Sequence, residues 1–80
     1  MDITPYVRPA FRQLREQFGL SQEALALNAG VDRTYVSGIE RGVRNPSLKS
    51  MQRLAAELDI TLDRVFILAR QMAQGRAASK

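Results

Sequence analysis

QEALALNAGVDRTYVSGIERG, residues 22–42, carries the start and stop signals of two short helices. Ser21 precedes it as a helix N-cap, because its hydroxyl oxygen can accept a hydrogen bond from a free N–H of the first turn. Gly30 can take the left-handed backbone conformation that ends a helix, and Asp32 is a second N-cap residue. The stretch therefore predicts a short helix before Gly30 and another over residues 33–41, joined as in a helix-turn-helix.

The second of these helices is expected to have one apolar and one polar face. Val36 and Ile39 lie three residues apart and share the apolar face. The polar face is expected to be exposed, and it carries Arg33, Thr34, Ser37 and Gly38. In a helix-turn-helix the second helix enters the major groove of DNA, with the side chains of its N-terminal half nearest the bases. The polar face is therefore the candidate DNA-binding surface.

The longer run LSQEALALNAGVDRTYVSGIERGVRNPS, residues 20–47, resembles the helix-turn-helix of the lambda-repressor and Cro superfamily, the Xre-type regulators. Its segment DRTYVSGIERGVRNPS is similar to the small controller proteins of bacterial restriction–modification systems. The resemblance covers residues 11–66, and the residues at matching spacings are Leu20-Ser21-Gln22-Glu23, Gly30, Ile39-Glu40, Gly42 and Asn45-Pro46-Ser47. It implies an all-α fold, a compact five-helix lambda-repressor-like bundle, and a sequence-specific DNA-binding transcription regulator.

The composition agrees with a DNA-binding domain and argues against an enzyme. The 80 residues suffice for one small domain, and 12 Lys and Arg against 8 Asp and Glu give a net charge of +4, which favours polyanionic partners. Because the chain has no Cys and no His, it lacks thiolate and imidazole metal ligands and the commonest nucleophile–base pairs. We expect double-stranded DNA as the partner, with no metal, no cofactor and no evident small-molecule ligand.

No segment of the sequence suggests a membrane. The start, MDITPYVRPAF, has no apolar core of signal-peptide length. No run approaches the roughly 20 apolar residues needed to span a bilayer. The expected location is the cytoplasm.

The helices that flank the central stretch are predicted from apolar periodicity. Phe11, Leu14 and Phe18 form a stripe that faces a core, and the helix that carries it can start at either Thr4-Pro5 or Arg8-Pro9. A second stripe follows the N-cap Ser47 and consists of Leu48, Met51, Leu54, Ala55 and Leu58. A last helix, capped by Thr61, is expected to run from Leu62 to about Gln74.

That last helix is more apolar than one core contact requires. We expect its residues Leu62, Val65 and Phe66 to face inward. The residues expected at a homodimer interface are Ile67, Leu68 and Met72, although a larger core would explain them as well. Residues 1–74 would then be a helix-turn-helix domain with a C-terminal dimerisation helix, and residues 75–80 a flexible basic tail.

The candidate DNA contacts divide into bases and backbone. Contacts to bases are assigned to Arg33, which can donate two hydrogen bonds to guanine, to Thr34, and to Ser37, whose hydroxyl can also reach a phosphate. Contacts to the DNA backbone are assigned to Gln22, Tyr35, Arg44 and Asn45. Gly38 is expected either to let the helix approach DNA closely or to be a tolerated cost.

The resemblance also implies a largely buried ion pair between Arg15 and Glu40, which would tie the first helix to the recognition helix. Two separate surface charges are the alternative reading. The functional prediction is a dimer that binds a pseudo-palindromic operator and controls a restriction–modification operon. A phage-type repressor, an antitoxin that regulates its own gene, and a protein-interaction module on the same fold are the alternatives.

Overall fold

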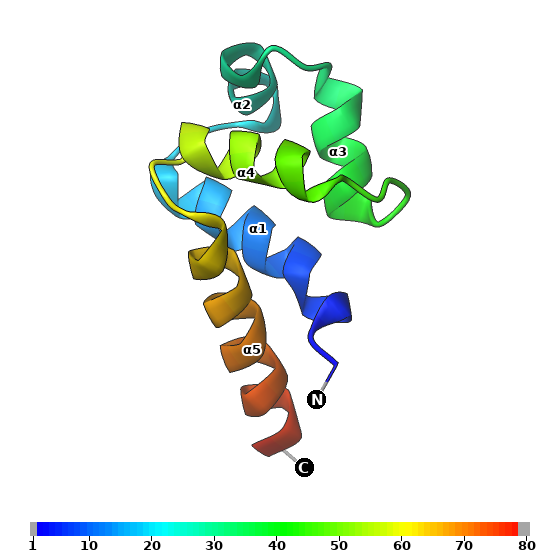
Figure 1. Ribbon diagram of the computed structural model, residues 1–80, viewed down its shortest axis with the longest axis vertical. Coiled ribbons are helices and arrows are strands. Elements are labelled where there is room, and N and C mark those ends of the chain that lie inside the picture. The colour runs from blue at the N-terminus through cyan, green and yellow to red at the C-terminus, as the bar shows by residue number, and fades with distance from the viewer. Residues whose placement is uncertain (1, 79–80) are drawn as a thin grey trace.

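The chain folds into five helices arranged in the order that the sequence predicts. The computed structural model describes the backbone of residues 2–78 and the side chains of residues 2–75. Its helices are α1 (Thr4–Phe18), α2 (Gln22–Ala29), α3 (Arg33–Arg41), α4 (Leu48–Glu57) and α5 (Leu62–Ala78), and no strand occurs in the described range. The predicted all-α, five-helix fold is therefore confirmed. The helices α2 and α3 lie at the end of the molecule opposite the two chain ends (Figure 1).

The serine caps and glycine ends that define the central helices form as predicted. The N–H of Ala24 donates to the Ser21 hydroxyl oxygen at 3.0 Å, and the N–H of Ser50 donates to that of Ser47 at 3.1 Å. Gly30, at the end of α2, has a φ of 71°, which an L-residue with a side chain rarely adopts. Asp32 occupies the N-cap position of α3, but its side chain makes no capping hydrogen bond. Its negative charge nevertheless lies at the N-terminus of α3, where the helix dipole favours it.

The first helix starts at the earlier of its two possible positions. Ile3, rather than Thr4, is the N-cap residue, and the N–H of Thr4 is satisfied by the side chain of Asp2 at 3.0 Å. That hydrogen bond lowers the pKa of the exposed Asp2 carboxyl, because it stabilises the charged form. Pro5 lies in the first turn, where a missing N–H is tolerated, whereas Pro9 lies inside the helix.

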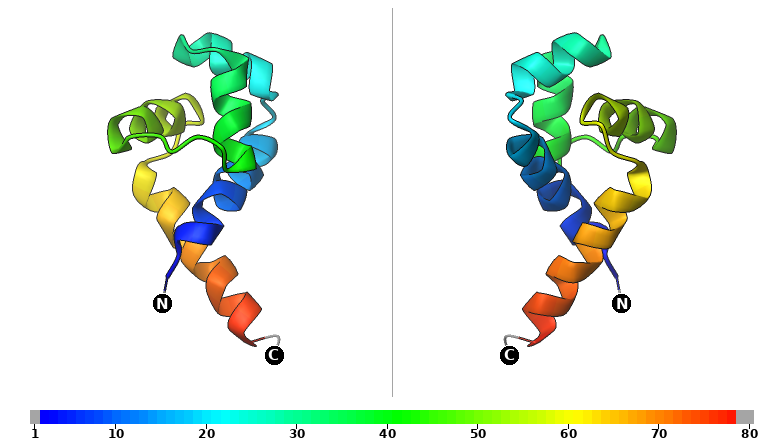
Figure 2. Two further views of the ribbon diagram at one scale, coloured as in Figure 1. Left: turned by 90° about the vertical axis from the view of Figure 1, so that its right-hand side faces the viewer. Right: turned by 90° about the vertical axis from the view of Figure 1, so that its left-hand side faces the viewer.

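The core is shared by all five helices. Its largest fully buried side chains are Phe11, Leu25, Val36, Ile39, Leu54, Leu58 and Val65. The most extensive contact between helices joins α1 to α5, while α2 packs on α3 and α4 (Figure 2). Because α1 also contacts α3, the helix-turn-helix rests on the first and fourth helices, and α5 packs against those two from the other side.

Two residues that were predicted to be in the core are exposed. Phe18 is 50% exposed and Leu48 is 66% exposed. Phe18 is the last residue of α1 and Leu48 is the first residue of α4. At these ends the apolar stripe extends beyond the neighbouring helices that bury the rest of it. Ala10 and Arg15 complete the buried face of α1 instead.

The last helix is longer than predicted. It continues from Gln74 through Gly75 to Ala78, beyond the end predicted at about Gln74. A glycine inside a helix costs about 1 kcal/mol relative to alanine, which weakens a helix without ending it. Residues 79–80 lie outside the described part of the chain.

The outer surface of α5 is apolar mainly at one position. Val65 and Ala69 are buried, as is Ala73 one turn further on. Ile67 is 40% exposed, whereas Leu68 and Met72 are half-buried and pack against the core. Part of the surplus predicted for a dimer interface therefore enlarges the core.

Candidate nucleic-acid interface

The N-terminal turn of α3 presents its polar side chains to solvent. Arg33 and Thr34 are exposed, while Tyr35 and Ser37 are half-buried. On the opposite face, Val36 and Ile39 are buried in the core and fix the rotation of the helix about its axis. The sequence-predicted polar face is thus held outward at the tip of the molecule.

The loop that follows α3 is tied back to the helix at Gly38. The N–H groups of Val43 and Arg44 both donate to the Gly38 carbonyl oxygen, at 2.9 and 3.1 Å. Gly42, with a φ of 83°, makes the tight reversal that allows this. Arg44 and Asn45, the predicted contacts to the DNA backbone, are exposed to solvent. They lie in a loop whose first half is held against α3 by these hydrogen bonds.

Arg44 also packs against the surface of α3. Its guanidinium carbon lies 5.8 Å from the centre of the Tyr35 ring, within reach of a cation–π interaction. A Cβ placed on Gly38 would lie 2.6 Å from the Arg44 Cγ. Because Gly38 is buried against this side chain, packing of the loop is a second role for the glycine beside the predicted close approach to DNA.

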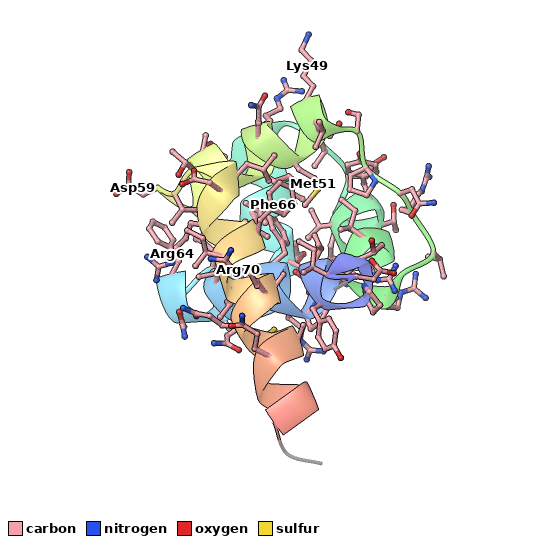
Figure 3. All side chains as sticks on the ribbon, turned by 60° about the horizontal axis from the view of Figure 1, so that its bottom comes forward. Lys49, Met51, Asp59, Arg64, Phe66 and Arg70 are labelled. Atoms are coloured by element: carbon pink, nitrogen blue, oxygen red, sulfur yellow. The ribbon has the colours of Figure 1, made fainter. Side chains whose placement is uncertain are left out.

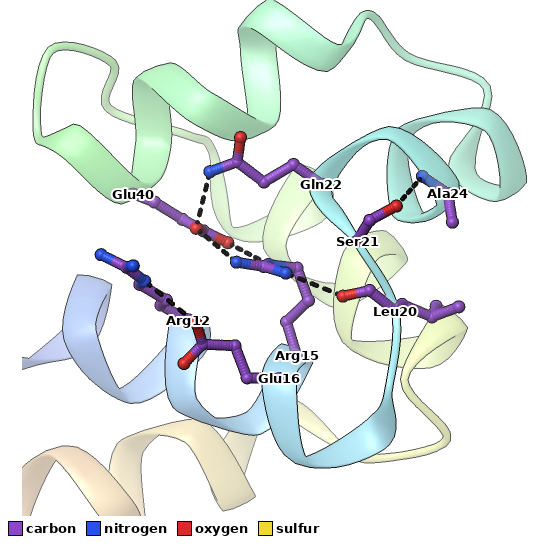
Figure 4. A network of polar contacts seen from close by, with 8 residues as sticks. All are labelled: Arg12, Arg15, Glu16, Leu20, Ser21, Gln22, Ala24 and Glu40. Atoms are coloured by element: carbon purple, nitrogen blue, oxygen red, sulfur yellow. Dashed lines mark hydrogen bonds and ion pairs between the residues drawn. The ribbon is translucent and has the colours of Figure 1, made fainter.

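A buried ion pair joins α1 to the C-terminal end of α3 (Figure 4). Arg15 Nε donates to Glu40 Oε2 at 2.7 Å and Arg15 Nη2 donates to Glu40 Oε1 at 3.1 Å, so the pair is bidentate. The side chains are 9% and 2% exposed. The hydrogen bond to Glu40 raises the pKa of the Arg15 guanidinium. This is the ion pair that the resemblance implies, and the alternative of two separate surface charges is wrong.

The network extends to both ends of the turn before α2. Arg15 Nη1 donates to the carbonyl oxygen of Leu20 at 2.7 Å. Gln22 Nε2 donates to Glu40 Oε1 at 2.9 Å. One amide hydrogen of Gln22 is therefore committed inside the protein, and its second hydrogen and its oxygen remain for an outside partner. The network fixes the start of α2 relative to the end of α3 (Figure 4).

Sequence reasoning missed one residue beside the interface. Arg8 of α1 lies over the end of α3, where a Cβ on Gly42 would be 2.8 Å from the Arg8 Cζ. A positive charge at the C-terminus of a helix is favourable because of the helix dipole. The position of Arg8 beside Gly42 could not be predicted from the sequence, because only the tertiary fold brings these two residues together.

The described residues contain no group of three or more potential metal-ligating side chains. The helices within residues 2–78 include none that is long and apolar enough to cross a membrane.

The fold and this surface together identify the chain as a DNA-binding helix-turn-helix protein. Residues 11–65 match the helix-turn-helix family HTH_3, and the chain belongs to that family. Its members are transcription regulators and not enzymes, and this chain is a DNA-binding regulator of the same kind.

Restriction–modification controllers are prominent among the similar proteins. The control protein C.MunI of Mycoplasma is 46% identical over 52 residues, which cover 65% of this chain and 70% of that protein. The crystal structure of the controller protein C.AhdI of Aeromonas hydrophila has a TM-score of 0.72 at 47% identity, covering 75% of this chain and 91% of that one. The controller protein C.Esp1396I has a TM-score of 0.78 at 31% identity, covering 89% and 93%. The resemblance to this group is therefore confirmed.

Proposed function

We propose that this protein is a homodimeric regulator that binds a pseudo-palindromic operator and controls a restriction–modification operon. The observation that carries the proposal is the exposed polar turn of α3, held outward by a buried core face and by the Arg15–Glu40 pair. A helix supported in this way can enter a major groove without changing its own packing. Similarity to C.MunI and C.AhdI supports the controller role.

The base contacts are assigned to the exposed turn of α3. Arg33 would donate two hydrogen bonds to O6 and N7 of a guanine. Thr34 would donate to a base or place its methyl group against a thymine, and Ser37 would contact the next base along the groove. Arg33 and Thr34 are exposed in the free protein, so reading these bases requires no opening of the core.

The backbone contacts surround this turn. Arg44 and Asn45 would bind one phosphate from the loop, and Tyr35 would donate its hydroxyl to a neighbouring one. Gln22 would use its second amide hydrogen on a phosphate at the N-terminus of α2, where the helix dipole favours an anion. The protein would act in the cytoplasm, where the bacterial chromosome lies.

Dimerisation is proposed through the outer surface of α5. Ile67 contributes its exposed apolar side chain, and Leu68 and Met72 contribute the parts that the core leaves uncovered. A two-fold dimer would place two copies of α3 on one face of DNA, about 34–36 Å apart, which requires a pseudo-palindromic operator.

The dimer is tested by sedimentation of the Ile67→Asp variant at micromolar concentration. A charge at a buried interface should convert the dimer to a monomer and reduce operator binding without lowering the melting temperature of the fold. Leu27→Asp is the matched control for sedimentation, because Leu27 is 81% exposed on α2 and does not belong to α5. A wild-type protein that sediments as a monomer, or equal effects of the two variants on sedimentation, would contradict the dimer surface.

The DNA target is tested by selecting duplexes from a random pool with the wild-type protein. The selected sequences should contain inverted half-sites whose centres lie about one helical turn apart, or a multiple of it. Failure to enrich any sequence would overturn specific binding. Two results bear on the operon alone: the selected site lies elsewhere than upstream of restriction–modification genes, or it leaves their transcription unchanged. Either result would contradict control of such an operon without contradicting specific DNA binding.

A further inference from the structure

The side chain of Arg44 lies along α3, although the residue belongs to the loop that follows this helix. Its backbone N–H donates to the Gly38 carbonyl oxygen at 3.1 Å, and a Cβ placed on Gly38 would lie 2.6 Å from its Cγ. Its guanidinium carbon lies 5.8 Å from the centre of the Tyr35 ring. Tyr35 and Gly38 are three residues apart and share one face of α3. The charge of a loop residue is therefore placed beside the first turn of α3, which carries Arg33 and Thr34.

The Tyr35 ring has its position set by the core, whereas the guanidinium group of Arg44 has few other contacts. Tyr35 is half-buried and packs against the core cluster. Arg44 is exposed, and its guanidinium group forms no salt bridge and no hydrogen bond with the part of the chain that the structure describes. The ring is therefore the contact that can fix the guanidinium group in place.

An aromatic ring holds a guanidinium group without occupying its hydrogen-bond donors. The attraction acts between the positive charge and the negative face of the ring. The N–H donors of the Arg44 guanidinium group therefore stay available, and its charge is not neutralised. A carboxylate in the same place would occupy donors and cancel the charge, as Glu40 does for Arg15. The ring thus suits an arginine that must later bind an anion.

We propose that Tyr35 is a positioning residue for Arg44, whose guanidinium group its ring holds in the free protein in the place from which the arginine contacts DNA. A side chain that is ordered before binding loses less conformational entropy when it binds. This role of the ring is separate from the phosphate contact of the Tyr35 hydroxyl group. The inference rests on the proposed function, because it requires that this face of α3 binds DNA.

The contact between the two side chains is tested first in the free protein by NMR. Arg44→Gln changes an exposed loop residue, so the fold should be kept, and it should shift the signals of the Tyr35 ring. Tyr35→Leu should shift the Nε–H signal of Arg44, and Tyr35→Phe should leave it nearly unchanged. Tyr6→Leu, at a half-buried tyrosine of α1, is the control that should not move it. Tyr35 ring signals that do not respond to Arg44→Gln would overturn the proposal.

The effect on DNA binding is tested by titrating the selected operator with variants at position 35. Tyr35→Phe removes the hydroxyl group alone, whereas Tyr35→Leu removes the ring as well. Tyr35→Leu should bind about two- to tenfold more weakly than Tyr35→Phe, which is the cost of ordering one long side chain. In the Arg44→Ala background the two variants should bind equally, because the arginine that the ring positions is absent.

Two results of this titration would overturn the proposal. Equal binding of Tyr35→Phe and Tyr35→Leu in the presence of Arg44 would show that the ring does not contribute. A difference that persists in the Arg44→Ala background would show that the ring acts by another route, such as the packing of α3. If Tyr35→Leu does not fold, Tyr35→Met takes its place in the same comparison, because methionine fills irregular apolar space.

Lys49 provides a matched control for the loss of a positive charge. It is exposed at the start of α4 and extends away from the rest of the molecule (Figure 3). Lys49→Ala should leave the difference between Tyr35→Phe and Tyr35→Leu intact, and its loss there would overturn the proposal. If the protein selects no operator, the proposed function fails while the NMR comparison can still be read. If it selects an operator and the difference survives Arg44→Ala, this inference fails alone.

Discussion

The two halves of α3 carry different kinds of residue in different surroundings. In the N-terminal half, Arg33 and Thr34 are exposed, and their side chains make no hydrogen bond with the part of the chain that the structure describes. In the C-terminal half, Ile39 is buried and Glu40 is bonded to both Arg15 and Gln22. One short helix thus combines an exposed surface, the proposed recognition surface, with a buried anchor.

Substitutions in the two halves should therefore change different properties of the protein. The free energy of folding should depend on the C-terminal half, because its side chains exchange water for protein contacts when the chain folds. Binding specificity should depend on the N-terminal half, because its side chains exchange water for contacts only when DNA binds.

The largest expected effect comes from Glu40→Ala, which breaks the anchor. The substitution leaves the buried Arg15 guanidinium without its carboxylate and Gln22 without its acceptor. Removing one partner of a buried ion pair costs about 3–5 kcal/mol, because the remaining charge stays desolvated. We expect a large drop in melting temperature in the absence of DNA, measured by circular dichroism.

A second arginine–glutamate pair in the same protein provides the control. Arg12 and Glu16 are 3.4 Å apart on the surface of α1, with side chains 62% and 54% exposed. Exposed pairs contribute about 0–1 kcal/mol, so Glu16→Ala should shift the melting temperature only slightly. Equal shifts for Glu40→Ala and Glu16→Ala would show that burial of the first pair contributes nothing.

The next largest effect is expected from Arg33→Ala, which removes an exposed side chain from the N-terminal half of α3. Affinity for the selected operator should fall by about 1–3 kcal/mol, and the preference at one base position of each half-site should relax. Binding to scrambled DNA and the melting temperature should stay nearly unchanged. Titration of both duplexes measures this, and equal losses on the two would mean that Arg33 contacts a phosphate.

A smaller and less selective effect is expected from Arg44→Ala. The residue is exposed on the loop, and a phosphate contact carries no base information. Affinity should fall alike on operator and scrambled DNA, and the slope of log affinity against log salt concentration should become shallower by about one unit per site. A loss confined to the operator would instead make Arg44 a base contact.

The local signals in the sequence were sufficient for most of the fold. Ser21 and Ser47 form the predicted caps, and Gly30 takes the predicted left-handed conformation, because these features depend on neighbouring residues alone. The Arg15–Glu40 pair joins residues that are 25 positions apart. No periodicity links them, and only the resemblance to a family implied their contact.

The remaining errors share a physical cause. An apolar stripe predicts which way a side chain points, but not how far the neighbouring helices extend to cover it. The stripes therefore place Phe18 and Leu48 in the core, whereas both are exposed in the structure. The contacts of Arg8 with Gly42, and of Arg44 with Gly38, depend on the path of the chain after α3. That path is a tertiary property, which the turn-forming residues of the loop do not determine.

The smallest expected effect on stability, and the sharpest test of the boundary between the two halves, is Gly38→Ala. Alanine would favour the helix by about 1 kcal/mol, and its Cβ would displace the Arg44 Cγ, which is 2.6 Å away. Because the Cγ lies close to the backbone of Arg44, moving it costs free energy that offsets the helix gain, and the two effects should nearly cancel in the melting temperature. Gly75→Ala is the control, since nothing lies within 4 Å of a Cβ at Gly75.

Operator binding by the Gly38→Ala variant distinguishes two roles for the glycine. If it positions Arg44, the substitution should weaken binding on operator and scrambled DNA alike, reduce the salt slope as Arg44→Ala does, and have no further effect in the Arg44→Ala background. If Gly38 instead allows α3 to approach the bases, the same loss should persist in that background, since it would not pass through Arg44. A double-mutant cycle of the two substitutions, measured by titration at several salt concentrations, therefore decides whether Gly38 belongs to the anchoring half of α3 or to its recognition surface.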